Sequence, residues 1–266
     1  GNMGAGVGVM LTVRNNVPRV LWVPDDYQTI QNAVRGSENG DTVMVRPGTY
    51  NESIQLLEKR ISIVSSEGPE VTIIDGTNYS VVIWVTGGQD TNTVIRGFTI
   101  INSSSEFFPY GIYVELSGPK IVNNILTVPN YFDQVRGGSC IRGDMNSMVV
   151  RNNLMVEAGT CVQSYLCWGD VSNNMIMHAY MGFWNSALHG QTLIPDYNLF
   201  WDYEFVFNEN TRLWGEHNID NQEPLFEEGS YRLIRGSPGI DKGRPEILDI
   251  DGTRSDIGVY GGPYAY

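Results

Sequence analysis

The fold of this chain is decided by a repeating interval, which first appears in residues 111–127, GIYVELSGPKIVNNILT. Three aliphatic residues each lie twelve positions before the second residue of an Asn-Asn pair: Ile112 before Asn124, Ile141 before Asn153, and Val162 before Asn174. The pairs recur after 29 and then 21 residues, a spacing typical of solenoid proteins. A constant interval inside a variable period indicates one structural coil that is stacked repeatedly, with outer loops of free length.

Each repeating unit contains three short apolar runs separated by Gly, Asn and Ser. In the first unit the runs are 111–114, 120–122 and 125–127. Short runs rich in β-branched residues predict strands rather than helices. Asn suits the corner between strands, because it tolerates the left-handed backbone conformation and its amide can bond to the same amide one coil away.

The repeat continues more weakly on both sides of this region. Gly97 takes the place of Asn at a bend, twelve residues after Val85, and Phe183 with Asn198 resembles a further coil. We therefore expect a single all-β domain over residues 1–266, a right-handed parallel β-helix with three sheets. Its N-terminal cap is expected at about residues 21–40, its coils at 41–205, and late coils with an irregular segment at 206–266.

Two stretches at the ends carry a family resemblance. The first reads VPDDYQTIQNAV at 23–34, followed by GDTV at 40–43 and PGTY at 47–50. The second reads SPGIDKG at 237–243, with DIDG at 249–252 and DIGVY at 256–260. Together with the repeat, these stretches resemble the pectin-lyase-like β-helix proteins. The resemblance implies a short helix that plugs the end of the coil stack, with Asp26 as its expected N-cap and Ile30, Ala33 and Val34 as its apolar stripe.

The amino-acid composition limits the classes of partner that this protein can bind. The formal net charge of −13 argues against nucleic acid and also against a polyanionic substrate, unless local basic residues or Ca²⁺ offset it. No apolar run approaches the ~20 residues of a membrane span. The first residues show no signal-peptide pattern. From the family resemblance alone, we expect a secreted or cell-surface bacterial protein that binds polysaccharide, and we expect a monomer.

The cysteines give a further test of the stacking. Cys140 and Cys161 each precede an aliphatic residue of the repeat, so they should lie in adjacent coils at a distance that a disulfide tolerates. Two small buried thiols are the alternative. No CxxC or HxxxH spacing accompanies them, which argues against zinc.

Alternation along the strands predicts two outward columns of side chains. With Ile112, Ile141 and Val162 inward, the first column contains Tyr113, Arg142, Gln163 and Trp184. The second contains Glu115, Asp144 and Tyr165. The neighbouring loops and strand ends carry further aromatic and charged residues: Tyr110, Tyr131, Phe132, Arg136, Trp168 and His189. Aromatic faces with a few charged groups are typical of sugar-binding grooves, and the resemblance implies a groove on this face.

Catalysis on this face could take two forms. In β-elimination, Arg142 or Tyr165 would act as base or acid, while Arg136, or Ca²⁺ held by Asp144 and Glu115, neutralises a uronate carboxylate. In hydrolysis, Glu115 and Asp144 would be the paired carboxylates. The chain has no Asn-Thr-Asp with Gly-His-Gly, typical of polygalacturonases, and no Arg-x-Pro-x-x-Arg, typical of pectate lyases.

Two readings without catalysis stay open. The columns could bind a glycan without cleaving it, as an adhesion or binding module would. They could also be purely structural, because cross-strand stacks of aromatic and polar side chains stabilise sheets and an Arg-Asp surface pair contributes little. The leading hypothesis from the sequence is a polysaccharide lyase that acts on a uronate-containing glycan.

Overall fold

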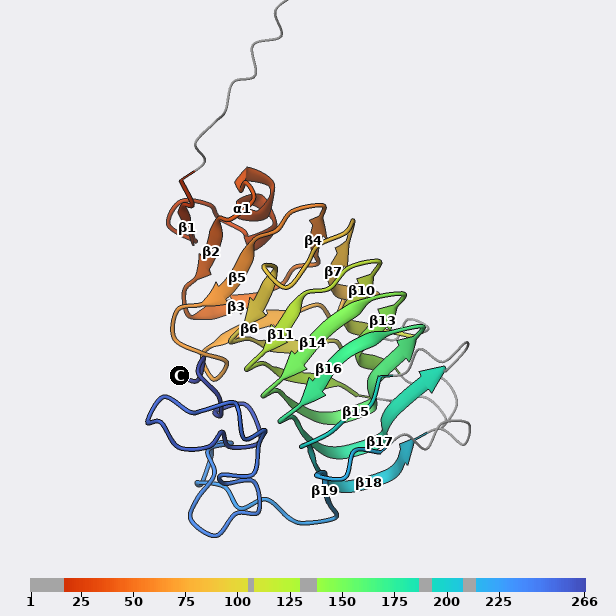
Figure 1. Ribbon diagram of the computed structural model, residues 1–266. Helices are drawn as coiled ribbons and strands as arrows, with labels where there is room; N and C mark the ends of the chain where they lie inside the picture. Colours follow the sequence, from red (N-terminus) through yellow and green to blue (C-terminus); the bar gives the residue numbers. More distant parts are fainter. Residues whose placement is uncertain (1–16, 105–107, 130–137, 187–192, 208–213) are drawn as a thin grey trace, which may run out of the picture.

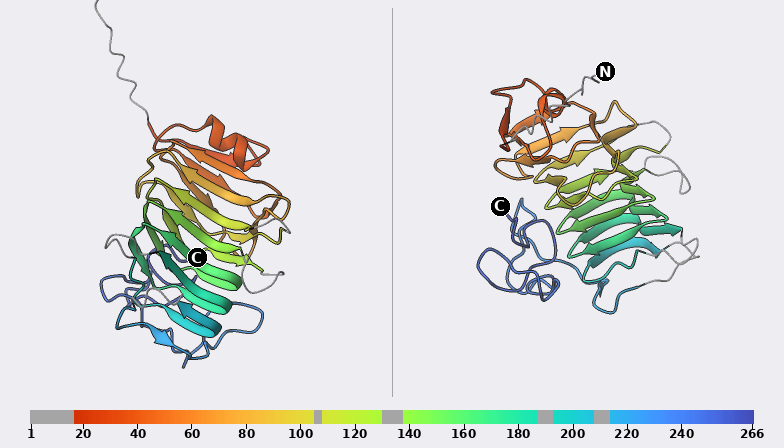
Figure 2. Two further views of the ribbon diagram at one scale, coloured as in Figure 1. Left: turned by 90° about the vertical axis from the view of Figure 1, so that its right-hand side faces the viewer. Right: turned by 45° about the horizontal axis from the view of Figure 1, so that its top comes forward.

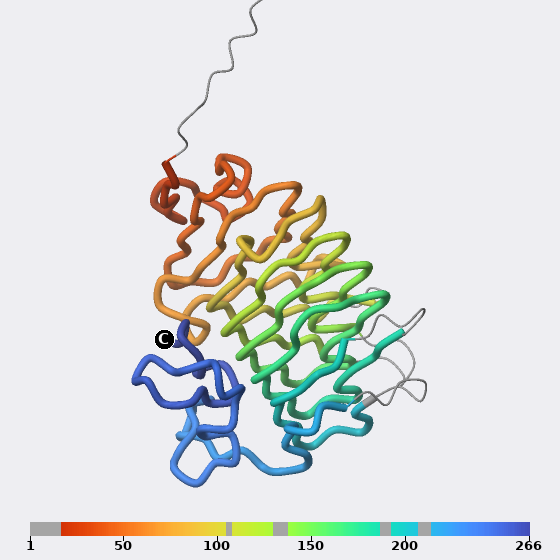
Figure 3. Tube along the Cα trace, in the orientation of Figure 1, coloured from red at the N-terminus to blue at the C-terminus, as the bar shows by residue number. Residues whose placement is uncertain are grey.

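The computed structural model describes residues 17–104, 108–129, 138–186, 193–207 and 214–266. Within these residues the chain winds into stacked coils, and every pair of neighbouring strands in the stack is parallel (Figures 1 and 3). In the earlier coils, three short strands lie on three separate faces. This is the right-handed parallel β-helix expected from the sequence.

Three faces surround the core. The first face consists of β1 (Val20–Val23), β2 (Thr42–Val45), β5 (Ser62–Ser65), β8 (Val94–Arg96), β11 (Lys120–Val122), β14 (Ser147–Arg151) and β16 (Trp168–Ser172). The second face begins with β3 (Gly48–Tyr50), β6 (Thr72–Asp75), β9 (Thr99–Ile101) and β12 (Ile125–Val128). The third face begins with β4 (Ile54–Leu57), β7 (Val81–Thr86), β10 (Tyr110–Glu115) and β13 (Ser139–Asp144).

The later coils lose one of their corners. Strands β15 (Leu154–Tyr165) and β17 (Met175–Ser186) run without interruption from the second face into the third. They join the two faces into one sheet, which β18 (Leu199–Phe207) and β19 (Ile219–Asp220) extend. The expected three-sheet arrangement is therefore confirmed for the earlier coils, and two of the sheets merge from β15 onward.

The interior of the stack is a set of aliphatic columns. One column on the third face consists of register partners that are at most 3% exposed: Ile54, Ile83, Ile112, Ile141, Val162 and Phe183. The inward assignment of the aliphatic repeat is thus confirmed. Because side chains alternate along each strand, the residue after each of these must point outward.

The second Asn of each pair is buried and bonds to its counterpart in the next coil. The backbone N–H and the Nδ2 group of Asn124 both donate to Oδ1 of Asn153, at 3.0 and 3.1 Å. The same double contact joins Asn153 to Asn174, Asn174 to Asn198, and Asn198 to Asn218. Each amide also donates to backbone carbonyls, which satisfies groups that the corner would otherwise leave unpaired.

The first Asn of each pair has a different task. Asn123, Asn152 and Asn173 adopt φ values of 54°, 51° and 58°, which lie in the left-handed region. They bind the C-terminal segment, residues 221–266, which runs back along the outside of the stack (Figures 1 and 2). Asn123 Nδ2 donates to the carbonyl oxygens of Val259 and Gly261, both at 2.8 Å.

The segment approaches this corner closely. Asn152 Nδ2 donates to Asp256 O at 3.0 Å, and Arg244 N donates to Asn173 Oδ1 at 2.8 Å. A Cβ atom added at Gly243 would lie 2.7 Å from Asn173 Nδ2, so this position requires glycine. The segment is thus held along its length by side chains of the repeat.

A short helix closes the N-terminal end. Helix α1 (Ile30–Gly36) buries Ile30, Ala33 and Val34, as expected. The expected N-cap, Asp26, is wrong: Thr29 is the N-cap, because its extended backbone lets its side chain accept the N–H of Asn32 at 3.1 Å. Asp26 instead accepts the N–H of Trp22 in strand β1.

Cys140 and Cys161 lie in adjacent coils, between directly paired residues of β13 and β15. Both are fully buried free thiols. Burial, and then the neighbouring Cys140 thiol, raises the pKa of Cys161 well above its ordinary value. In the part of the chain that the structure describes, no helix is long and apolar enough to cross a membrane.

We predict that Asn153→Ala lowers the free energy of unfolding by about 3 kcal/mol, because it leaves several buried backbone groups without partners. Asn51→Ala removes an exposed amide of the same type and should change stability by less than about 0.5 kcal/mol. Urea denaturation of both variants measures the difference. Equal urea midpoints for the two variants would show that the Asn contacts between coils do not stabilise the protein.

Candidate functional site

The first outward column exists as the sequence predicts, and it is longer. Strand register places Tyr113 beside Arg142, Arg142 beside Gln163, and Gln163 beside Trp184. On the other side of Tyr113 the column continues to Trp84 and Gln55. We call these six residues the third-face column: Gln55, Trp84, Tyr113, Arg142, Gln163 and Trp184. All six side chains are at least partly exposed.

The second column lies beside the first on the same face. Glu115 pairs with Asp144, and Asp144 pairs with Tyr165. Tyr165 is 36% exposed, and Trp168, at the start of the next coil, is 48% exposed. The structure therefore brings together the residues that the alternation predicts.

Arg142 is the centre of the polar contacts on this face. Its Nε and Nη2 groups donate to Asp144 Oδ2 at 3.2 and 3.1 Å, and its Nη1 group donates to the Tyr110 hydroxyl at 3.1 Å. The Tyr113 hydroxyl donates to the same Asp144 oxygen at 2.7 Å. The guanidinium carbon lies 5.4 and 5.8 Å from the ring centres of Tyr110 and Tyr113. One planar cation is thus fixed between two aromatic rings and a carboxylate.

These contacts shift proton affinities in a consistent direction. Burial raises the pKa of the Tyr113 phenol, and the hydrogen bond to Asp144 raises it further. Burial lowers the pKa of the Arg142 guanidinium, but the hydrogen bond to Asp144, together with other contacts, outweighs burial, so the net pKa is raised. These contacts stabilise the charged form of the Arg142 guanidinium.

Aromatic rings extend this surface away from Arg142. The ring centres of Trp84 and Tyr113 are 5.6 Å apart, and those of Tyr110 and Tyr113 are 5.8 Å apart. Both separations are within the range of favourable ring contacts. On the other side, Gln163 Oε1 accepts from Ser139 Oγ at 3.0 Å.

The residues present do not fit the Ca²⁺ site considered from the sequence. Oδ2 of Asp144 already accepts from Arg142 and Tyr113, and its Oδ1 is buried without a hydrogen-bond partner. Within the described ranges, no group of three or more His, Cys, Asp or Glu side chains is placed to hold a metal ion. No step through Ca²⁺ is therefore derived. Of the other expected site residues, Tyr131, Phe132, Arg136 and His189 lie outside the described residues.

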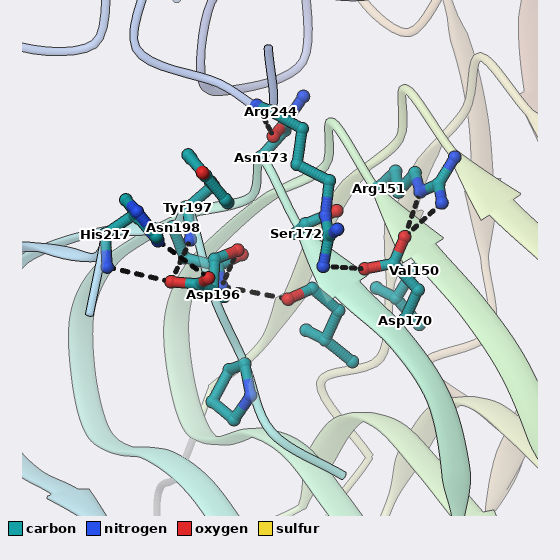
Figure 4. Close-up of polar contacts among 12 residues, drawn as sticks. Val150, Arg151, Asp170, Ser172, Asn173, Asp196, Tyr197, Asn198, His217 and Arg244 are labelled. Atoms are coloured by element: carbon teal, nitrogen blue, oxygen red, sulfur yellow. Dashed lines mark hydrogen bonds and ion pairs between the residues drawn. The ribbon is translucent and has the colours of Figure 1, made fainter. Parts of the chain in front are cut away.

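A second polar cluster lies at the Asn corner of the last coils, where another residue takes the place of the first Asn. Tyr197 precedes Asn198 and His217 precedes Asn218, so both occupy that outer position. Their rings stack with centres 4.3 Å apart and planes 3° apart. His217 Nδ1 lies 3.0 Å from Asp196 Oδ2 (Figure 4).

The same cluster ties the C-terminal segment to the stack. In Figure 4, Arg151 and Arg244 both point toward Asp170, and the ion pair of Arg244 with Asp170 measures 3.3 Å. The guanidinium groups of Arg244 and Arg254 each lie 5.6 Å from the Tyr197 ring centre. Sequence reasoning missed this cluster, although the positions of Tyr197 and His217 before the corner Asn could have revealed it.

A cleft of about 600 Å³ separates the C-terminal segment from the second face. Its lining contains four glutamates, Glu70, Glu157, Glu227 and Glu228. Glu70 accepts from Ser230 Oγ at 3.0 Å and from the Tyr260 hydroxyl, so it joins the two walls. The cleft was not predicted, because its second wall comes from the irregular segment.

Several solved structures are weakly similar to this chain. No family model and no curated protein matches it. Three solved pectin methylesterases are similar to it. The enzyme PemA from Erwinia chrysanthemi is 10% identical, with 81% of this chain and 74% of that chain covered and a TM-score of 0.39. The carrot enzyme is 13% identical, with 80% and 90% covered and a TM-score of 0.34.

The third is the rice weevil enzyme, which is 13% identical, with 92% of this chain and 82% of that chain covered and a TM-score of 0.36. Scores and identities this low carry no argument about activity or substrate. The fold itself rests on the strand pairing described above.

We predict that Asp144→Ala lowers the free energy of unfolding by about 2 kcal/mol, because it leaves the donors of Arg142 and Tyr113 unpaired in a partly buried place. Combined with Tyr113→Phe, the loss should be smaller than the sum of the two single losses. Chemical denaturation of the wild type, the two single variants and the double variant measures this coupling.

The matched control is Asp25→Ala, which removes the carboxylate of the exposed pair with Arg46. It should cost less than about 1 kcal/mol. Equal losses for Asp25→Ala and Asp144→Ala would mean that the Asp144 contacts are an ordinary surface pair.

Proposed function

We propose that this protein is carbohydrate-active and binds a polysaccharide along the third-face column. The observation that carries the proposal is the continuous register of six aromatic and polar side chains on one exposed face. Rings at Trp84, Tyr113 and Trp184 offer flat apolar surfaces, and Gln55, Arg142 and Gln163 offer groups that hydrogen-bond hydroxyls or carboxylates. Such a combination is typical of sugar sites.

A repeating surface suits a repeating ligand. The column advances by one strand spacing of about 4.8 Å per coil, so its contacts recur at a constant interval. A linear glycan also presents ring faces and hydroxyls at a constant interval. The same rungs can therefore contact successive sugar residues with similar geometry.

The guanidinium of Arg142, which Asp144 holds in place, favours a ligand with carboxylate groups. Asp144 fixes one edge of Arg142, while the Nη1 group of Arg142 donates to the hydroxyl of Tyr110. A carboxylate replacing that hydroxyl would gain a charge-assisted hydrogen bond, which is roughly twice as strong. The fixed cation is the specific reason to keep β-elimination of a uronate glycan as the finer proposal.

In that reaction Arg142 would stabilise the developing charge on the carboxylate, and the Tyr165 phenolate would take the α-proton from C5. The C4–O bond would break as the C4=C5 double bond forms, and the leaving oxygen would take the proton back from the Tyr165 phenol. Tyr165 is exposed and pairs with Asp144, one strand from Arg142. Hydrolysis by Glu115 and Asp144 is less well supported, because Oδ2 of Asp144 already accepts from two side chains. A secreted or cell-surface location accompanies the proposal as an expectation.

The binding test uses the intact chain with a panel of pectin, polygalacturonate, alginate and neutral glucans in affinity electrophoresis. We expect retardation by a uronate polymer and its loss in Trp84→Ala. Tyr264→Ala removes a ring that is 45% exposed on the C-terminal segment, and it should leave binding unchanged. Thermal melting checks that both variants are folded. Retardation that survives Trp84→Ala would place the glycan elsewhere.

The reaction test follows the ultraviolet absorbance of the unsaturated product formed by β-elimination. If the protein is a lyase, Arg142→Ala should lower the rate by about a hundredfold, because it removes the group that stabilises the developing charge. Binding without any rise in absorbance would mean a binding module. Full activity in Arg142→Ala would remove that residue from the mechanism.

A further inference from the structure

The third-face column ends at a cleft beside the N-terminal helix. Strand β4 is the outermost strand of this face, and α1 lies next to its open edge (Figure 1). Between them is a cleft of about 270 Å³, lined by Gln31, Val34 and Arg35 of α1 and by Gln55, Leu57 and Lys59. Gln55 belongs to both the column and the cleft, so the two are continuous.

The charge of this cleft is opposite to that of the molecule. The chain has a formal net charge of −13, yet the lining contains two cations and no carboxylate. The cleft against the C-terminal segment, in contrast, is lined by four glutamates. Because the Debye length is about 8 Å at physiological ionic strength, a ligand in the small cleft responds mainly to nearby charges. Besides the two lining cations these include Glu52, which binds α1, and Glu58, next to Lys59 in the chain.

The two cations have separate tasks. Lys59 Nζ contacts the carbonyl oxygens of Val34, Arg35 and Ser37 at 2.7, 2.7 and 2.9 Å. Three acceptors require three N–H donors, so Lys59 is an ammonium group that fixes the C-terminal end of α1. Arg35 is exposed, and its contact with Asn32 Oδ1 is long, at 3.5 Å. Its remaining donors are available to a ligand.

The wall that α1 forms is held firmly against β4. Gln31 Oε1 accepts the N–H of Gln55 at 2.6 Å. Glu52 accepts the N–H groups of Ile30 and Gln31 at 2.9 and 3.0 Å. A ligand that follows the column toward this end therefore meets a fixed barrier rather than a continuing groove.

We propose that this cleft binds the terminal uronate residue of a glycan, with Arg35 on its carboxylate and Gln55 on its hydroxyls. The proposal rests on the proposed function and adds recognition of a chain end. Gln55 and Arg142 are three strand spacings apart, about 14 Å, with Trp84 and Tyr113 between them. Two cations, Arg35 in the cleft and Arg142 on the column, with Gln55 and two aromatic rungs between them, match an acidic chain that ends at α1.

The experiment compares two uronate oligosaccharides of equal length by calorimetry. In one of them the terminal carboxyl group is reduced to the alcohol. We expect Arg35→Gln to weaken binding of the acidic oligosaccharide about tenfold and to leave binding of the reduced one unchanged. Lys120→Gln, which removes a cation from the first face, should leave both affinities unchanged. Thermal melting confirms that the variants are folded.

Fragmenting a fixed mass of polymer supplies a second measurement. If ends are recognised, binding capacity rises with the number of ends. Capacity that follows polymer mass alone, or an Arg35→Gln protein with unaltered affinities, overturns the end subsite. If Trp84→Ala still abolishes binding in that case, the glycan-binding face stands. A wild-type protein that binds no glycan overturns both proposals.

Discussion

The structure depends on a constraint at one corner: a buried backbone bend has polar groups that must find partners. In each coil the second Asn supplies them, and its Oδ1 accepts two N–H groups from the preceding coil. An amide in this position can satisfy its neighbours only when the coils are aligned, because a shift of one residue would exchange buried and exposed side chains. The corner therefore sets the register of the other two faces.

Register at the corner makes the outer columns possible. Residues that are about 29 positions apart in sequence, such as Tyr113 and Arg142, become direct neighbours. The C-terminal segment packs on the Asn corner, whereas the third face lies on a different side of the stack (Figures 1 and 2). The two Asn positions of each coil thus hold the coils and the C-terminal segment together. The strand on the third face can therefore carry different outward side chains without disturbing the stack.

The sequence predicts the stacking of the central coils because every such coil obeys the same interval. The prediction is wrong for the earlier coil, where the interval changes. Val85 pairs with Val114 rather than with Ile112. Arg96 pairs with Val122, so Gly97, which follows Arg96, corresponds to the first Asn of the pair rather than to the second. Gly97 has a φ of 82°, which shows that the bend conformation, rather than the amide, is what this coil retains. A glycine satisfies the backbone requirement but cannot show which Asn it replaces.

The candidate site is predictable in position but not in contacts. Alternation places Tyr113, Arg142 and Asp144 on one face, but it does not say which way a long guanidinium points. Arg142 turns to Asp144, two residues away on its own strand, and to Tyr110 on the neighbouring strand, because these groups satisfy its donors in a partly buried place. The Arg35 cleft depends on how α1 meets β4, a contact between segments with no shared period.

Net charge illustrates the same limit. A formal net charge of −13 argues against an acidic ligand only if the charged residues are spread evenly over the surface. In the structure they are spread unevenly. Four glutamates gather in the cleft beside the C-terminal segment, while the cleft at α1 has cations and no carboxylate. With screening over about 8 Å, these two surfaces act nearly independently. An acidic protein can thus present local cations, here Arg142 and Arg35, to an acidic glycan on a face away from its most acidic cleft.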